Sequence, residues 1–264
     1  MSNDLIYVYC ISHPPPGPAP ELESTEIKTI AFDGFHIFVK YVSESDFSEE
    51  NLKRHLSDLE WLETNAREHI RIISMIMADC DVIPFKFGTI FNTIVGLENF
   101  ISDYAGSMLE NFDHIKGKEE WALKIYCDRK KLIDQIDLIS KEAAEMETQI
   151  MASSPGKAFL LRRKKTDFIE NEMDRICKKY SQEYYEVLNN QSESTYLNNL
   201  LPQEYTGKDT TMILNATFLV NKSKVSAFTS VIEIFKNRDL DSGFYIEESG
   251  PWPPFSFINI KEKK

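Results

Sequence analysis

The chain has 264 residues, of which 42% are hydrophobic and 27% charged, and its formal net charge is −12. The length suits two domains of ordinary size, and the composition suits a packed core rather than a disordered chain. The negative charge argues against general nucleic-acid binding, and the absence of any run of about 18 apolar residues argues against a transmembrane helix.

The first half of the chain alternates short apolar segments with helical patterns. Residues 4–12 are typical of a strand, the Pro-rich residues 13–21 of an extended surface loop, and residues 26–42 of a hairpin that turns at Asp33-Gly34. Apolar residues at three- and four-residue steps predict one helix of about thirty residues after Ser48, which would cap it. Residues 81–91 predict a strand with Pro84 at its edge and Gly88 at its end, and residues 93–115 predict a second helix.

The second half repeats this alternation. Residues 117–128 predict a strand, and residues 129–151 predict a single helix that Asp128 caps. Pro155 marks a helix boundary, and a long helix is expected from about Gly156 to Asn190, with Phe159 on its apolar side. Further patterns predict a strand at 211–221, a helix at 222–238, and two extended runs around a Pro-rich bend at 243–260. The expected fold class is α+β, with helices on one face of an antiparallel sheet in each of two domains, 1–117 and 118–264.

Motifs for catalysis are absent from the sequence. It contains no Gly-rich phosphate loop, no H-E-x-x-H metal motif and no G-x-S-x-G nucleophile turn. His55 and His69 lie about 21 Å apart on one predicted helix, too far to share a metal ion. The four cysteines form no C-x-x-C pair, and the N-terminus does not resemble a secretory signal, so we expect reduced thiols in a cytoplasmic protein without cofactors. An enzyme with a dispersed site remains an alternative.

Two segments are candidates for partner binding. The basic cluster "LLRRKKTD" at 160–167 contains Arg162 and Arg163, and is interpreted as a solvated helix or as a docking patch for an acidic partner. A nucleic-acid or regulatory binding module is an alternative function that this cluster alone would support. The segment "GPWPPFSFI" at 250–258 contains Trp252, Phe255 and Phe257, which either cover the end of a sheet or form an exposed apolar patch for a partner.

Six stretches, in chain order, resemble the GvpF/GvpL family of gas vesicle proteins. They are "LIYVYCI" (5–11), "WLETNAREH" (61–69), "DVIPFKFGTIF" (81–91), "GKEEWALKIYCD" (117–128), "SPGKAFLLRRKK" (154–165) and "GPWPPFSFI" (250–258). The resemblance covers nearly the whole chain and leaves open which of the two paralogues this protein is.

The resemblance implies a fold of two ferredoxin-like domains, the second with extra long helices. It implies a non-enzymatic accessory or minor structural protein of gas vesicle assembly, located in the cytoplasm at the gas vesicle. The implied partners are the hydrophobic shell protein GvpA and other accessory gas vesicle proteins, with neither nucleic acid nor a lipid membrane among them.

Within "DVIPFKFGTIF" we expect structural roles for Pro84, Lys86, Phe87 and Gly88. Lys86 stands where the family's P-x-R-F-G pattern often has arginine. Lysine keeps the charge but lacks the two-pronged geometry of a guanidinium. We expect Lys86 to neutralise an acidic residue at the boundary between the domains.

Overall fold

A computed structural model describes residues 4–13, 26–239 and 241–261. The chain divides into two compact units, unit 1 with Met1–Glu120 and Pro251–Lys264, and unit 2 with Trp121–Gly250. The predicted domains, 1–117 and 118–264, assigned the C-terminal residues to the second domain, whereas the contacts group them with unit 1. Most of the Pro-rich segment at 13–21 lies outside the described residues.

Unit 1 contains an antiparallel sheet in the order β2-β3-β1-β4, with β5 also paired to β1. Its strands are β1 (Asp4–Ser12), β2 (Lys28–Phe32), β3 (Phe35–Ser43), β4 (Val82–Pro84) and β5 (Ile90–Phe91). The predicted hairpin is confirmed, because Phe32 pairs with Phe35 across Asp33 and Gly34. Both turn residues have positive φ, 49° and 80°, as the tight turn of a two-residue hairpin requires.

Four helices accompany this sheet: α1 (Glu44–Phe47), α2 (Glu49–His55), α3 (Leu59–Met77) and α4 (Ile94–Ile115). The prediction of one long helix after Ser48 is wrong. Ser48 does cap α2, but that helix ends at His55, and the Asp58 carboxylate accepts the backbone N–H groups of Glu60 and Trp61. Asp58 therefore starts a new helix, which the continuous apolar spacing concealed.

The two longer helices cover opposite faces of the sheet in unit 1. One core cluster joins alternate residues of β1, such as Ile6 and Val8, to apolar residues of α4. Another joins the intervening residues, such as Tyr7 and Tyr9, to Ile72, Ile73 and Ile76 of α3. Because strand β1 is buried on both sides, it is continuously apolar, and this arrangement differs from the single helical face expected.

Unit 2 has a four-stranded sheet in the order β7-β8-β6-β9. The strands are β6 (Lys118–Cys127), β7 (Ser194–Leu197), β8 (Thr211–Asn221) and β9 (Phe244–Trp252). In chain order this sheet reads second, third, first, fourth, the arrangement of a split β-α-β ferredoxin-like fold. The sheet of unit 1 has the same order, and the α+β fold class is confirmed. The short edge strand β7 was not predicted.

The helices of unit 2 include two that pack on one face of its sheet, α8 and α10. Its helices are α5 (Arg129–Asp134), α6 (Ile136–Ile139), α7 (Lys141–Met151), α8 (Pro155–Asn189), α9 (Gln203–Thr206) and α10 (Val225–Arg238), and the 3₁₀ turn η1 (Lys222–Lys224) precedes α10. Asp128 caps α5 as predicted, but the expected single helix up to residue 151 is broken at Gln135 and Ser140. The Ser140 hydroxyl accepts the backbone N–H of Ala143 and so begins α7.

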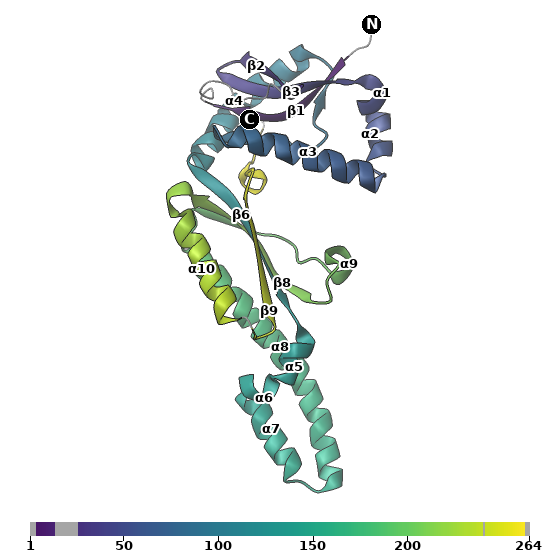
Figure 1. Cartoon of the computed structure of the whole chain (residues 1–264), viewed down its shortest axis with the longest axis vertical. Helices are drawn as coiled ribbons and strands as arrows, with labels where there is room; N and C mark the ends of the chain where they lie inside the picture. Colours follow the sequence, from purple (N-terminus) through teal and green to yellow (C-terminus); the bar gives the residue numbers. More distant parts are fainter. Residues whose placement is uncertain (1–3, 14–25, 240, 262–264) are drawn as a thin grey trace. The chain divides into compact units, whose positions relative to one another are not determined.

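Helix α8 extends beyond the sheet of unit 2. It has 35 residues, which corresponds to about 52 Å, and begins at Pro155, one residue before the predicted start at about Gly156. Its first half lies alongside α7, and together with α6 they form a helical extension of unit 2 (Figure 1). We call the part of this extension formed by residues 138–164 the hairpin end.

Candidate interaction sites

Residues 81–91 form the two short strands β4 and β5 with a turn between them. Both strands pair with β1. The Phe85 N–H donates to the Tyr9 carbonyl, and the Val8 N–H donates to the Thr89 carbonyl. Between these points, the Thr89 N–H donates to the Lys86 carbonyl and closes a four-residue turn. Gly88 is its third residue with a φ of 80°, which is the type II geometry that favours glycine.

The structure places Pro84 and Lys86 in contrasting surroundings. Pro84 is buried at the end of β4, the edge strand, where its missing N–H costs no ladder hydrogen bond. Lys86 is exposed, and no ion pair within the described part of the chain includes it. The expected role of Lys86 at the boundary between the domains stays a prediction.

Phe87 belongs to an aromatic cluster around a buried histidine. The His69 ring is hydrogen-bonded at Nδ1 to the Tyr7 hydroxyl (2.8 Å) and at Nε2 to the Phe85 carbonyl (2.9 Å). The ring of Phe87 meets His69 edge-on at 5.7 Å between centroids, and the Gly88 N–H donates to the Tyr7 hydroxyl. Burial lowers the pKa of His69, so the ring is held neutral and ties α3 to the turn.

The C-terminal aromatic residues lie in a segment that packs against unit 1. Strand β9 continues to Trp252, and the 3₁₀ turn η2 (Phe255–Phe257) follows in place of a second extended run. Pro253 and Pro254 are buried, and the Phe255 ring lies 6.5 Å from that of His69. Trp252 and Phe255 are each 37% exposed and Phe257 is half-buried. Only part of this aromatic group is thus available to a partner.

Two polar side chains of unit 1 hold the C-terminal segment. The buried Glu120 carboxylate accepts the backbone N–H of Ser256 (2.9 Å) and its hydroxyl (2.7 Å). The Asn111 side chain accepts the Asn259 N–H and donates to the Asn259 carbonyl. Burial raises the pKa of Glu120 even though the Ser256 hydrogen bonds oppose that shift. Neither residue stood out in the sequence, because both are polar positions of ordinary elements.

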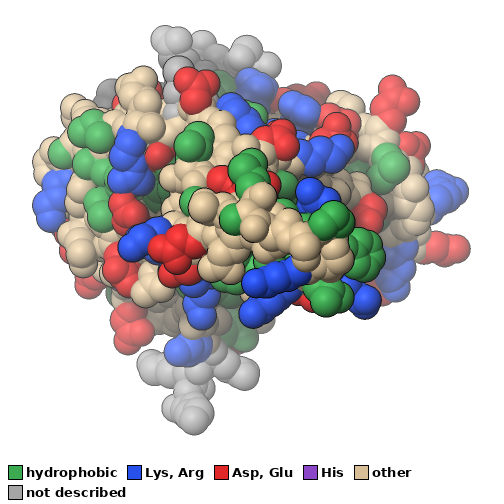
Figure 2. Space-filling view, turned by 90° about the horizontal axis from the view of Figure 1, so that it is seen from below, with side chains coloured by type: hydrophobic (Ala, Val, Ile, Leu, Met, Phe, Trp, Pro, Cys, Tyr) green, Lys and Arg blue, Asp and Glu red, His purple; other side chains and the backbone are tan. Residues whose placement is uncertain are grey.

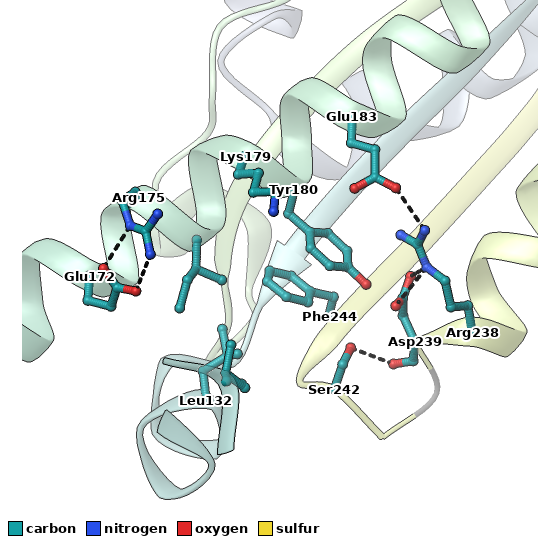
Figure 3. A pocket seen from close by; sticks show the side chains of 12 residues that line it. Leu132, Glu172, Arg175, Lys179, Tyr180, Glu183, Arg238, Asp239, Ser242 and Phe244 are labelled. Atoms are coloured by element: carbon teal, nitrogen blue, oxygen red, sulfur yellow. Dashed lines mark hydrogen bonds and ion pairs between the residues drawn. The ribbon is translucent and has the colours of Figure 1, made fainter. Parts of the chain in front are cut away.

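Unit 2 contains a pocket of about 380 Å³ between α8, α5 and the end of α10 (Figure 3). Its apolar wall includes Leu132, Tyr180 and Phe244, and the last two rings stack at 3.7 Å between centroids. Arg238 bonds Glu183 and Asp239 at its rim, and Arg175 bonds Glu172. Lys179 also lines the pocket, so three cationic and three carboxylate side chains balance one another. The pocket therefore suits an apolar side chain better than a charged ligand.

The hairpin end exposes large apolar side chains. Leu138 is 90% exposed, Met151 79%, Phe159 68% and Leu160 67%. The prediction that Phe159 lies on the buried side of α8 is therefore wrong. Helix α7 covers other positions of α8. Amphipathic spacing identified Phe159 as apolar but could not show that nothing covers it.

Basic side chains accompany this apolar group. Residues 148–164 contain Lys157, Arg162, Arg163 and Lys164 and no acidic residue. All four are exposed, and within the described residues no ion pair includes any of them. Seen from the side on which the hairpin end lies, green hydrophobic and blue basic side chains stand next to one another (Figure 2). The part of the hairpin end at 148–164 is thus both apolar and basic, in a chain of net charge −12.

Lys165, the last cation of the basic cluster, has a different environment. Its ammonium group contacts the carboxylates of Asp137 on α6 and Glu147 on α7. The pKa of Lys165 is raised, because these hydrogen bonds and charges outweigh the effect of burial. One lysine therefore joins the three helices of the extension.

Two further searches cover only the described residues. No helix there combines the length and the apolarity needed to cross a membrane. No group of three or more His, Cys, Asp or Glu side chains could hold a metal ion there.

A family model described as "Gas vesicle synthesis protein GvpL/GvpF" matches residues 5–259 of the chain. Gas vesicle protein L of Streptomyces sp. (strain CB03234) is 24% identical over 272 residues, covering 100% of this chain and 96% of that protein.

Two solved structures are similar to this one along nearly the whole chain. Gas vesicle protein GvpF from Anabaena sp. PCC7120 has a TM-score of 0.70 at 18% identity, over 98% of this chain and 100% of that one. GvpF from Microcystis aeruginosa has a TM-score of 0.67 at 17% identity, with the same coverage. At such low identity these structures support the fold alone.

Proposed function

This chain belongs to the GvpL/GvpF family of gas vesicle synthesis proteins, and we propose that it is a non-catalytic accessory or minor structural protein of vesicle assembly. In this role it binds the hydrophobic shell protein GvpA, together with other accessory gas vesicle proteins, in the cytoplasm at the growing vesicle. Binding would shield the apolar surface of the shell subunit and limit its aggregation before assembly.

The observation that carries this proposal is the exposed apolar group at the hairpin end. Leu138, Met151, Phe159 and Leu160 are all at least two-thirds exposed and lie on one helical extension. Large apolar side chains that gather on a surface mark sites of contact with other proteins. The basic residues Arg162 and Arg163 would then orient an acidic region of a partner rather than supply most of the affinity.

The C-terminal aromatic residues are a second candidate surface. Trp252 and Phe255 retain part of their surface, but the segment that carries them is anchored by Glu120 and Asn111. Replacing Phe255 and Phe257 would disturb the packing of unit 1. We therefore place the main contact at the hairpin end and assign Trp252 an auxiliary role.

Co-expression of the full chain with GvpA, followed by affinity purification and sizing, tests the proposal. We expect a soluble complex with the unmodified chain. The triple variant Met151→Ser, Phe159→Ser and Leu160→Ser removes three apolar contacts with the partner. Each contact is partly buried and should contribute about 1 kcal/mol to the free energy of binding. The sum of about 3 kcal/mol corresponds to a loss of affinity of about two orders of magnitude.

A matched control replaces apolar residues of similar exposure elsewhere. Leu59 at the start of α3 and Tyr205 on α9 are 80% and 81% exposed, and the variant Leu59→Ser with Tyr205→Ser should keep the complex. If the triple variant retained GvpA as well as the control does, the hairpin end would not be the contact. If the unmodified chain formed no complex with GvpA but was present in isolated vesicles, the protein would not shield the shell subunit before assembly. It would instead be a minor component of the vesicle.

A further inference from the structure

Two cysteines from distant parts of unit 2 meet in its core. Cys127 is the last residue of β6 and Cys177 lies in α8, and their Sγ atoms are 3.4 Å apart. We propose that Cys127 and Cys177 are an oxidisable dithiol, and that their intramolecular disulfide ties the middle of α8 to the sheet of unit 2.

The distance between the two sulfur atoms favours this reaction. A disulfide bond is about 2.05 Å long, so the sulfur atoms must approach by only about 1.4 Å. Both residues belong to the same buried cluster, which includes Leu132 and Phe244 and holds β6, α5 and α8 together. The backbones that carry the thiols are therefore already fixed near each other.

The surroundings distinguish the two thiols. Cys127 is completely buried, whereas the residue Cys177 is 7% exposed. We therefore expect an external oxidant to react at Cys177 first, once local motion opens the site. The hydrogen bond with Cys127 and the positive charge of Arg129 lower the pKa of Cys177. Thiolates are the attacking form in thiol–disulfide exchange, so this thiol is the better nucleophile of the pair.

The reaction balances with a small-molecule disulfide such as glutathione disulfide as the oxidant. The Cys177 thiolate attacks one sulfur atom, forms a mixed disulfide and releases one glutathione thiolate. The Cys127 thiol then loses its proton and attacks Cys177, which forms the internal bond and releases the second glutathione. Two cysteine thiols are oxidised and one glutathione disulfide is reduced to two thiols.

The internal bond would restrain the helical extension. The chain between the two cysteines spans α5, α6, α7 and the first half of α8, which together include the hairpin end. Closing a loop of this length limits the unfolded chain and stabilises the folded one. Oxidation would therefore hold α8 on its sheet without adding a group to the surface.

The test uses the full chain under native conditions. After incubation with glutathione disulfide, peptide mapping without reduction should find the Cys127–Cys177 cross-link, and the melting temperature should rise by roughly 4–10 °C relative to the same sample with dithiothreitol.

A variant checks the order of attack. In Cys127→Ala, Cys177 can still attack glutathione disulfide, but no second thiol is present to resolve the mixed disulfide. A glutathione adduct should therefore accumulate on Cys177. If this variant does not fold, the unmodified protein sampled at short times should show the same adduct before the cross-link. A folded protein whose Cys127 and Cys177 stay reduced, a cross-link between other cysteines, or an oxidised form with an unchanged or lower melting temperature would overturn the proposal.

Discussion

The Asn111 side chain pairs with the backbone of Asn259, 148 residues further along the chain, as a neighbouring strand would. Its Oδ1 accepts the Asn259 N–H at 2.8 Å, and its Nδ2 donates to the Asn259 carbonyl at 3.1 Å. The C-terminal segment thereby satisfies backbone groups that no strand of unit 1 pairs. Together with the Glu120 contacts to Ser256, this pair holds residues 251–261 in unit 1.

Asn111→Ala should destabilise the protein. The variant leaves the Asn259 N–H without its side-chain partner and the Asn259 carbonyl with the Ser107 hydroxyl alone. Because Asn259 is exposed to water, we expect a loss of about 0.5–1.5 kcal/mol in the free energy of unfolding. Chemical denaturation measures it, and limited proteolysis should cut the C-terminal segment sooner. Asn171→Ala is the control, because the Asn171 amide donates only to the carbonyl four residues earlier in an exposed part of α8. Equal effects of the two substitutions would contradict the assigned anchor.

Glu120 should make stability depend on pH. Its folded-state pKa is raised above the ordinary value of 4.5 by burial. The folded state then binds the proton more tightly than the unfolded state, so this contribution to stability is full below about pH 4.5 and is lost as pH rises through the folded-state pKa. Glu120→Gln cannot titrate. We therefore expect the melting temperature of the unmodified protein, relative to Glu120→Gln, to fall as the pH rises above about 4.5. A constant difference would argue against a raised pKa.

Gly88→Ala tests the turn at 86–89. At a φ of 80° an alanine is strained, so we expect a loss of about 1–2 kcal/mol in the free energy of unfolding. Gly106 gives a control of opposite sign, because it lies inside α4 with no atom within 4 Å of an added Cβ. Gly106→Ala should stabilise by about 0.5–1 kcal/mol through its helix propensity. The turn assignment fails if both substitutions stabilise the protein in urea denaturation.

Local patterns sufficed to predict most of the regular elements. The Asp33-Gly34 turn and β8 at Thr211–Asn221 each depend on neighbours in sequence, and the structure has them as predicted. Helix α8 begins at Pro155, within one residue of the predicted start. The helix breaks at Asp58 and Ser140 were missed, because the apolar spacing continues through both positions. The side chains of these two residues instead cap the N-termini of α3 and α7. Strand β7 was missed because only pairing with β8 makes Ser194–Leu197 extended.

The candidate sites were harder to predict, since exposure depends on what other segments cover. Composition made the Trp252–Phe257 segment look like an exposed patch, yet packing against unit 1 covers much of it. Conversely, Phe159 follows an amphipathic pattern but is exposed, because α7 does not cover it. The contact between Cys127 and Cys177 joins positions 50 residues apart, and no spacing rule indicates it.

Lys165 should be the one cation of the basic cluster that the fold requires. Its Nζ lies 2.7 Å from an Asp137 oxygen and 2.8 Å from a Glu147 oxygen, and the residue is 8% exposed. Lys165→Met keeps the aliphatic stem but leaves two carboxylates facing one another. Both acids are partly exposed, which reduces the effect through solvent screening, and we expect a loss of about 1–3 kcal/mol.

The neighbouring Lys164 supplies the matched control for that substitution. Lys164 is exposed, and no ion pair in the described part of the chain includes it, so Lys164→Met should change the free energy of unfolding by less than about 0.5 kcal/mol. Hydrogen exchange should show faster opening of α6 and α7 in Lys165→Met only, since the lysine links these helices to α8. Because a raised lysine pKa stabilises the fold at pH values below the unfolded-state pKa, the difference between the two variants should shrink as pH rises above about 10.5. If Lys164→Met loosened the helices as much as Lys165→Met, charge on the whole cluster, rather than the Lys165 contacts, would be holding the extension together.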